Sequence, residues 1–250
     1  MTSLEVVAVL IAGVWAGAIN TVVGSGTLVT FPVLLAVGYP PVVANVSNSI
    51  GLVPGSAAGA WGYRRELAGQ RARAIRLGTA SLLGAIAGAV LLLSLPAEAF
   101  EAIVPAFIVL ALVGIIFQPR LQAAIAHRTP RGENGGVLAW LGVFGGGIYG
   151  GYFGAAQGLL LISVLGLTLR EELQRINALK NVLAGLVNLV SGLVFVLVAD
   201  VAWEAVACVA VGATIGGVLG GRYGRRLPAT VLRAVIVAVG IAAIVLLVVR

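Results

Sequence analysis

Charge is the scarcest property of this sequence. Only 10% of its 250 residues are charged, whereas 60% are hydrophobic. A soluble domain carries about a quarter charged residues, so this chain has too little charge to coat a water-soluble fold. Histidine, cysteine and lysine occur once each, at His127, Cys208 and Lys180. These counts exclude an intramolecular disulfide framework and a metal site built from cysteine and histidine.

The residue patterns of an enzyme are also missing. The sequence has no phosphate-binding loop with a lysine and no pair of carboxylates inside an apolar segment. We therefore predict no enzyme activity, no catalytic residues, no metal site and no cofactor. The net charge of +7 is the kind of excess that a nucleic-acid partner would favour. Its distribution along the chain indicates membrane orientation instead, so we expect no nucleic-acid partner.

Apolar runs long enough to cross a bilayer recur along the chain. A crossing helix needs about 20 mostly apolar residues, and backbone in the bilayer core must form helices or a closed barrel. Barrel strands alternate apolar and polar residues, but runs such as 235–249 are apolar on every side. We predict an all-α, multi-pass membrane protein with a single transmembrane domain over residues 1–250. Residues 4–23 are interpreted as its first membrane segment and not as a removed signal peptide.

The apolar segments follow the same order twice, and each half contains one long segment, one short segment and three long ones. The predicted segments are 4–23, 27–37, 42–61, 75–95, 100–117, 137–153, 159–169, 176–198, 203–221 and 231–249. This order predicts a first repeat over 4–117, a cytoplasmic linker over 118–136 and a second repeat over 137–249. An ungapped offset of 132 residues places Gly26 on Gly158 and Asn45 on Asn177.

The arginines predict the orientation of the two halves. Cytoplasmic loops collect Lys and Arg, and five arginines follow the third segment, whereas the matching loop of the second half contains Asp200 and Glu204. Because these loops carry opposite charge, we expect the repeats to be inverted. Of the sixteen basic residues, only Arg250 then lies outside the cell. The predicted location is the inner membrane, with both termini extracytoplasmic.

The short segments 27–37 and 159–169 cannot cross a bilayer alone. Eleven residues give about 16 Å of helix, against a hydrocarbon core of about 30 Å. Each short segment is therefore expected to form a broken or re-entrant hairpin with the long segment before it. Two full crossings would leave the loops on the same sides, so this alternative stays open.

The expected hairpin tips, 20–27 and 152–158, are rich in glycine and small polar residues. Irregular backbone at membrane depth occurs only where protein or a watery cavity receives it. A helix that begins after such a turn presents free N–H groups and the positive end of its dipole. Two such ends from opposite faces would form an anion site near the midplane. The alternative is that these glycines only allow close helix packing.

Polar residues at spacings of three and four mark one face of a helix in each half. Asn45, Asn48 and Ser49 carry this pattern in the first half, and Asn177, Lys180 and Asn181 repeat it in the second. Polar groups inside a membrane are functional candidates. The alternatives are hydrogen bonding between helices for the asparagines and snorkelling to the interface for Lys180. The predicted substrate-binding residues are Asn20, Thr21, Gly24, Ser25, Gly26, Thr27, Asn45, Asn48, Ser49, Gln157, Gly158, Asn177, Lys180 and Asn181.

Four stretches of these residues resemble signatures of one transporter family. They are AINTVVGSG from Ala18, PPVVANVSN from Pro40, GGYFGAAQG from Gly150 and RINALKN from Arg175. In order and spacing they are similar to the TauE/SafE family of sulfite and organosulfonate exporters, over nearly the whole chain. One departure is Ala155-Ala156-Gln157, where the family often has glycines.

The resemblance implies a secondary transporter that exports small sulfur oxyanions, such as sulfite or sulfonates like sulfoacetate. Its partners would be the small anionic substrate, the lipid bilayer and a coupling ion, for which the proton is the candidate. A passive anion channel, another small-anion permease and an accessory subunit without transport are the alternatives. Neither the transport direction nor the oligomeric state follows from the sequence.

Overall fold

A computed structural model describes residues 1–126, 135–224, 234, 236–238 and 241 of the chain. These residues form α-helices and contain no strand, which confirms the all-α fold class. The helices are α1 (Ser3–Val22), α2 (Thr27–Val37), α3 (Pro41–Gly62), α4 (Arg71–Ser94), α5 (Ala97–Ala126), α6 (Gly136–Tyr152), α7 (Gln157–Thr168), α8 (Leu173–Val198) and α9 (Trp203–Tyr223). The last predicted segment, 231–249, lies almost wholly outside the described residues.

Long apolar helices confirm a membrane protein. Five of the described helices, α1, α4, α5, α8 and α9, are long and apolar enough to cross a bilayer. Large apolar side chains are exposed on the outside of the bundle, including Leu110 on α5 and Leu197 on α8. In water such a surface would be unstable, but it matches the hydrocarbon of a bilayer. The short helices α2 and α7 have 11 and 12 residues, as the segment lengths predict.

Helix α5 is longer than its apolar segment suggests. It continues nine residues beyond Phe117 to Ala126, so the start of the predicted linker 118–136 is helical. Pro119 does not end the helix. Residues 127–134 of that linker lie outside the described part of the chain.

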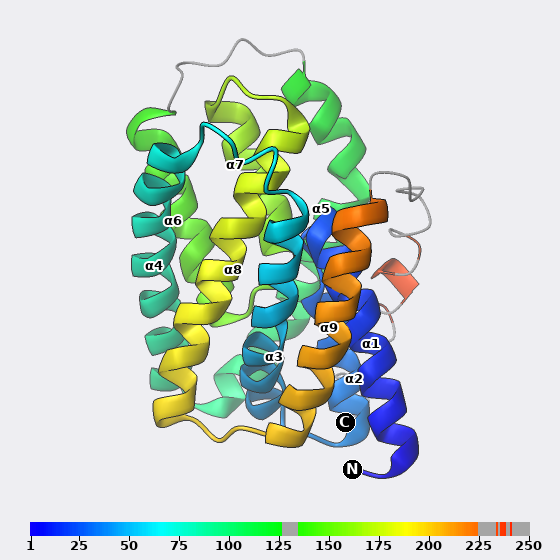
Figure 1. Cartoon of the computed structure of the whole chain (residues 1–250). Coiled ribbons are helices and arrows are strands. Elements are labelled where there is room, and N and C mark those ends of the chain that lie inside the picture. Colours follow the sequence, from blue (N-terminus) through cyan, green and yellow to red (C-terminus); the bar gives the residue numbers. More distant parts are fainter. Residues whose placement is uncertain (127–134, 225–233, 235, 239–240, 242–250) are drawn as a thin grey trace.

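Matching helices of the two halves run in opposite directions in Figure 1. Helix α1 rises from the N-terminus at the bottom of the view, whereas α6 starts at the top. Helices α3 and α9 likewise rise, whereas their counterparts α8 and α4 descend. This arrangement supports the expected inversion of the repeats, which stays a prediction together with their bounds.

The two halves exchange their first helices. Helix α1 packs against α9, and α6 packs against α4. Glycines allow the backbones to touch at both contacts, as in other membrane helix pairs. A Cβ atom on Gly216 of α9 would lie 2.0 Å from the Val14 carbonyl oxygen, and one on Gly84 of α4 would lie 2.4 Å from that of Phe144.

Hydrogen bonds at the helix breaks correct the ungapped offset of 132. The N–H groups of Val23 and Gly24 both donate to the Ile19 carbonyl, and 130 positions later Phe153 and Gly154 both donate to Tyr149. The α1–α2 hairpin therefore matches α6–α7 at an offset of 130, whereas Pro41 and Leu173, which begin α3 and α8, are 132 apart. The second half has two additional residues between the start of its short helix and the start of the next helix. Gly26 consequently matches Ala156, not Gly158.

Basic residues gather at the end of the bundle that lies opposite the N-terminus. The α3–α4 and α7–α8 connections both lie there (Figure 1). Glu171 bridges them, because its carboxylate pairs with Arg73 of α4 at 2.8 Å and with Arg175 of α8 at 2.5 Å. At the other end, the amino group of Met1 pairs with Glu204 at 3.0 Å. Which end faces the cytoplasm stays a prediction.

Candidate functional site

The first helix break touches the first turn of α7 inside the bundle. Residues 23–26 separate α1 from α2, and residues 153–156 separate α6 from α7. The Gly158 N–H donates to the Gly24 carbonyl at 3.0 Å. A Cβ on Gly24 would lie 2.4 Å from the Gly158 Cα, and one on Gly158 would lie 2.3 Å from the Gly24 Cα. Both positions therefore require glycine, and Gly24 also has a φ of +85°, which L side chains rarely adopt.

Each short helix begins at this junction. The first N–H groups of a helix have no intrahelical acceptor. At the start of α2, no acceptor within the described residues is found for the N–H groups of Ser25, Gly26 and Thr27. The Ser25 hydroxyl is completely buried and also has no partner among those residues. This end of α2 thus offers several unused donors in one place.

Helix α8 directs three side chains at the end of α1. Lys180 Nζ, Asn177 Nδ2 and Asn181 Nδ2 each lie 3.2 Å from the Thr21 carbonyl oxygen, and Lys180 Nζ also lies 2.9 Å from that of Asn20. The spacing of three and four residues along α8 brings them to one face, as the sequence predicts. Asn20 and Thr21 thus enter the site through their carbonyl oxygens.

Lys180 is completely buried. Within the described residues its hydrogen bonds go only to backbone carbonyls, and no carboxylate pairs with it. The interpretation that it snorkels to the interface is therefore wrong, because the side chain runs into the bundle and its Cδ lies against Gly158. A cation buried in this way without a carboxylate partner is costly.

The matching residues of α3 bind the second break and the start of α2. Asn45 Nδ2 donates to the Tyr152 carbonyl at 2.9 Å, just as Asn177 donates to α1. Asn48, which occupies the position matching Lys180, donates to the Thr27 hydroxyl at 3.1 Å and accepts from Thr30. The bonds of Asn45 and Asn177 thus connect each half to the hairpin of the other.

Two predicted site residues do not point at the junction. Gln157 belongs to the first turn of α7 and turns back, donating to the Gly146 carbonyl of α6 at 3.2 Å. Ser49 donates to the Asn45 carbonyl of its own helix at 2.9 Å. The hydrogen bonds of both side chains thus go to backbone carbonyls of α6 and α3 and not to the junction.

Sequence reasoning missed Ser56 as a site residue. Its hydroxyl accepts from Asn20 of α1 at 3.3 Å and from Asn188 of α8 at 3.4 Å. A pocket of about 260 Å³ between α3 and α8 is lined by Ser56 and Asn181 among apolar residues. Ser56 follows Asn45 by eleven residues, as Asn188 follows Asn177. Extending the polar spacing by two turns would have found it.

Comparison with known proteins decides the family. The sequence profile described as "Sulfite exporter TauE/SafE" matches residues 9–247. The chain belongs to the TauE/SafE family. It is 26% identical over 211 residues to the "Probable membrane transporter protein YfcA" of Escherichia coli strain K12, covering 80% of this chain and 74% of that protein. The proteins of the same name from Escherichia coli O6:H1 and O157:H7 match equally. No solved structure matches.

Membership in the TauE/SafE family establishes this chain as a membrane transporter. Within the described residues, no cluster of His, Cys, Asp or Glu could hold a metal ion. The polar groups around the junction of α1, α2 and α7 are amides, hydroxyls, backbone N–H groups and the amino group of Lys180.

Proposed function

We propose that this TauE/SafE protein is a secondary transporter that exports small sulfur oxyanions, sulfite or sulfonates, by alternating access. The observation that carries the proposal is the convergence of Lys180, Asn177 and Asn181 on the single carbonyl oxygen of Thr21. A carbonyl oxygen has two lone pairs, so three donors exceed what it accepts well. An oxyanion has several charged oxygens and fits such a donor set better.

Neutral amides are suited to transport as well as to binding. Hydrogen bonds to a charged partner contribute about 1.5–3 kcal/mol each, and a transported anion must also leave the site. Asn177 and Asn181 supply such bonds, and Lys180 supplies the opposite charge. In this proposal the Thr21 carbonyl occupies the donors when no anion is bound, and the arriving anion displaces it.

The start of α2 supplies the second set of donors. The dipole of a helix favours an anion at its N-terminus, and the unused N–H groups of Ser25, Gly26 and Thr27 lie there. The Ser25 hydroxyl, buried without a partner among the described residues, adds one more donor. The contact between Gly24 and Gly158 brings this end near Lys180, whose Cδ lies against Gly158.

Alternating access requires two elements that can move past each other around the site. Here Asn45 of the first half donates to the hairpin of the second half, and Asn177 of the second half donates to the hairpin of the first. Matching helices also run in opposite directions (Figure 1). We infer that the two hairpins rock in turn, each opening the site to one side of the inner membrane. Both termini would face the outside, and a proton is the proposed coupling ion.

Flux into proteoliposomes tests this function. Purified protein should give saturable uptake of radiolabelled sulfite, and counterflow when the vesicles are loaded with unlabelled sulfite. Asn177→Ala should reduce both signals at equal protein content. If folded protein moves neither sulfite nor a small sulfonate, the proposed substrate class is wrong. Single-channel currents without saturation or counterflow would instead identify a passive anion channel.

A further inference from the structure

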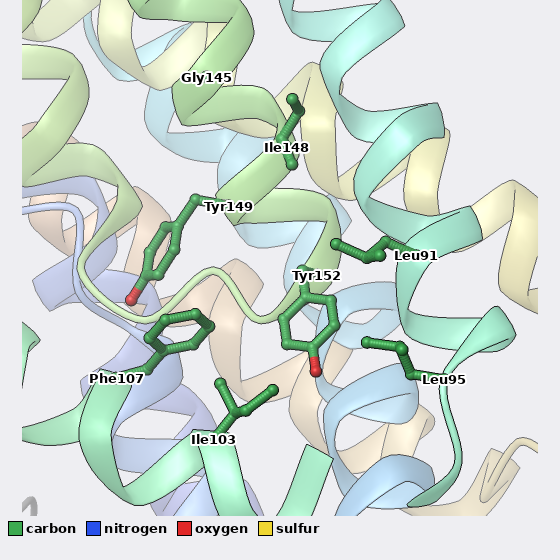
Figure 2. Close-up of a pocket in the computed structure, with 8 residues that line it drawn as sticks. All are labelled: Leu91, Leu95, Ile103, Phe107, Gly145, Ile148, Tyr149 and Tyr152. Atoms are coloured by element: carbon green, nitrogen blue, oxygen red, sulfur yellow. The ribbon is translucent and has the colours of Figure 1, made fainter. Parts of the chain in front are cut away.

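A pocket of about 320 Å³ opens between α4, α5 and α6. It is almost entirely apolar, and Figure 2 shows its lining of Leu91, Leu95, Ile103, Phe107 and Ile148 around Tyr152. Its volume falls in the range of small-molecule sites, which are mostly apolar with a few polar groups. Such a lining offers nothing to a small hydrated anion, so this pocket is separate from the proposed substrate site.

One polar group points into this pocket without a partner. Tyr152 is 4% exposed, and no hydrogen-bond partner for its hydroxyl is found in the described part of the chain. Figure 2 shows the hydroxyl directed toward the space between Ile103 and Leu95. The hydroxyl of the neighbouring Tyr149, by contrast, donates to the Ala155 carbonyl. Because buried tyrosine hydroxyls normally find a partner, the Tyr152 hydroxyl indicates a ligand with a hydrogen-bond acceptor.

The opening of the pocket indicates that the ligand comes from the bilayer. Leu91 of α4 and Leu95, just after its end, are 44% and 37% exposed, so the pocket opens sideways toward the hydrocarbon of the bilayer. Leu95 directly follows the last residue of α4, and Glu98 and Glu101 are exposed in the first turns of α5. The Tyr152 hydroxyl therefore lies close to the end of the bundle that carries the N-terminus. At this depth a phospholipid has its ester carbonyls, which accept hydrogen bonds.

We propose that this pocket binds one phospholipid of the leaflet at the N-terminal end of the bundle. An acyl chain lies along the apolar lining, and its ester carbonyl accepts a hydrogen bond from the Tyr152 hydroxyl. The site adjoins the second helix break: the Tyr152 carbonyl is held by Asn45, and Phe107 contacts the rings of Tyr149, Tyr152 and Phe153. The lipid thus supports the aromatic cluster that surrounds this break.

The chain offers a variant that fills the pocket without a steric clash. A Cβ on Gly145 would meet nothing within 4 Å, and Gly145 lines the pocket. Gly145→Leu should therefore place its side chain where the acyl chain lies. The matched control is Val211→Leu, which adds one methylene to an exposed position of α9. Tyr152→Phe keeps the ring and removes only the hydroxyl.

Native mass spectrometry of the whole delipidated protein, titrated with phosphatidylglycerol, measures the binding. Wild type and Val211→Leu should bind one lipid tightly, Gly145→Leu should lose that lipid, and Tyr152→Phe should bind it about tenfold more weakly. A phosphatidylglycerol with ether-linked chains has the same headgroup but no ester carbonyl. It should bind wild type about tenfold more weakly, and Tyr152→Phe should not weaken it further.

Two results would overturn the proposal. One is equal ester-lipid binding by wild type and Tyr152→Phe, because the hydroxyl would then have no lipid partner. The other is retention of the tight lipid by a folded Gly145→Leu protein. Lipid binding is measured without transport, so its failure would leave the proposed function untouched.

Discussion

Asn188 of α8 donates to the Ser56 hydroxyl of α3, and these two residues occupy matching positions of the two halves, 132 residues apart. In the predicted inverted repeats, two matching positions that contact each other would lie close to the axis that relates the halves. The Gly24–Gly158 contact is about one helical turn away from such a pairing. At the offset of 130 the position that matches Gly24 is Gly154, four residues before Gly158. The polar pair and the glycine junction thus lie where both halves meet.

Removing an amide from the proposed anion site should reduce transport strongly. Asn177→Ala and Asn45→Ala should each lower sulfite flux at least tenfold, which corresponds to about 1.4 kcal/mol of lost stabilisation. Asn188→Ala should have a smaller effect, because its bond to Ser56 is long, at 3.4 Å, and Asn188 lies about three turns of α8 beyond Asn177. The measurement is initial rate in proteoliposomes at matched protein content. Normal transport by Asn45, Asn177, Lys180 and Asn181 variants alike would place the site elsewhere.

The charge of Lys180 should control which anions are transported. Lys180→Gln keeps a donor for the Asn20 and Thr21 carbonyls but removes the positive charge from a fully buried position. We expect weaker binding from the cytoplasmic side and a smaller difference between monovalent and divalent anions. Competition of a series of oxyanions against labelled sulfite measures this. Unchanged charge preference in the variant would show that Lys180 has only a structural role.

The glycine junction should tolerate no side chain. Gly158→Ala would place a Cβ 2.3 Å from the Gly24 Cα, and Gly24→Ala would add an unfavourable φ to a similar clash. Overpacking costs about 1–3 kcal/mol and a strained backbone conformation about the same again. Thermal unfolding in detergent should show a clear loss of stability for both variants. Gly145→Ala, where the added atom meets open space, is the control and should unfold near the wild-type temperature.

Stability should depend on pH through Glu171. Burial raises the pKa of this carboxyl, but hydrogen bonds from Arg175 and Arg73 outweigh it, and the pKa is lowered from 4.5. The folded protein therefore binds this proton less tightly than the unfolded chain does. The ionised carboxylate stabilises the fold above pH of about 4.5, and this contribution is lost as pH falls further. Glu171→Gln should cost about 1 kcal/mol at pH 7, and its difference from wild type should shrink below pH 4.

Cysteine labelling tests the orientation of the chain. In a Cys208→Ser background, Asp200→Cys should react with an impermeant reagent from outside the cell, and Arg71→Cys only after the membrane is opened. These residues lie at opposite ends of the bundle, near the α8–α9 connection and at the start of α4. Labelling of both from the same side would refute the predicted inverted topology.

Segment lengths and polar spacing predicted most of this architecture. The short helices α2 and α7, and the shared faces of Asn45 with Asn48 and of Asn177 with Lys180, follow directly from local sequence. Periodicity could not predict their partners, because the Thr21 and Tyr152 carbonyls that they bind belong to distant segments. The register of the halves was missed for a similar reason. A two-residue difference in the segment between short helix and next helix is invisible in a sequence so rich in Ala, Gly, Leu and Val.

The exchange of first helices between the halves has a consequence for biosynthesis. Helix α1 ends at Val22, but its packing partner α9 begins only at Trp203. At about 5–20 residues per second, the ribosome needs on the order of ten seconds or more to produce that partner. During this time the glycine face of α1 has no backbone to pack against, and neither half can complete its own interior. We therefore expect the two halves to fold together, with the N-terminal half inserted in the bilayer as a partly folded intermediate until the second half has been synthesised.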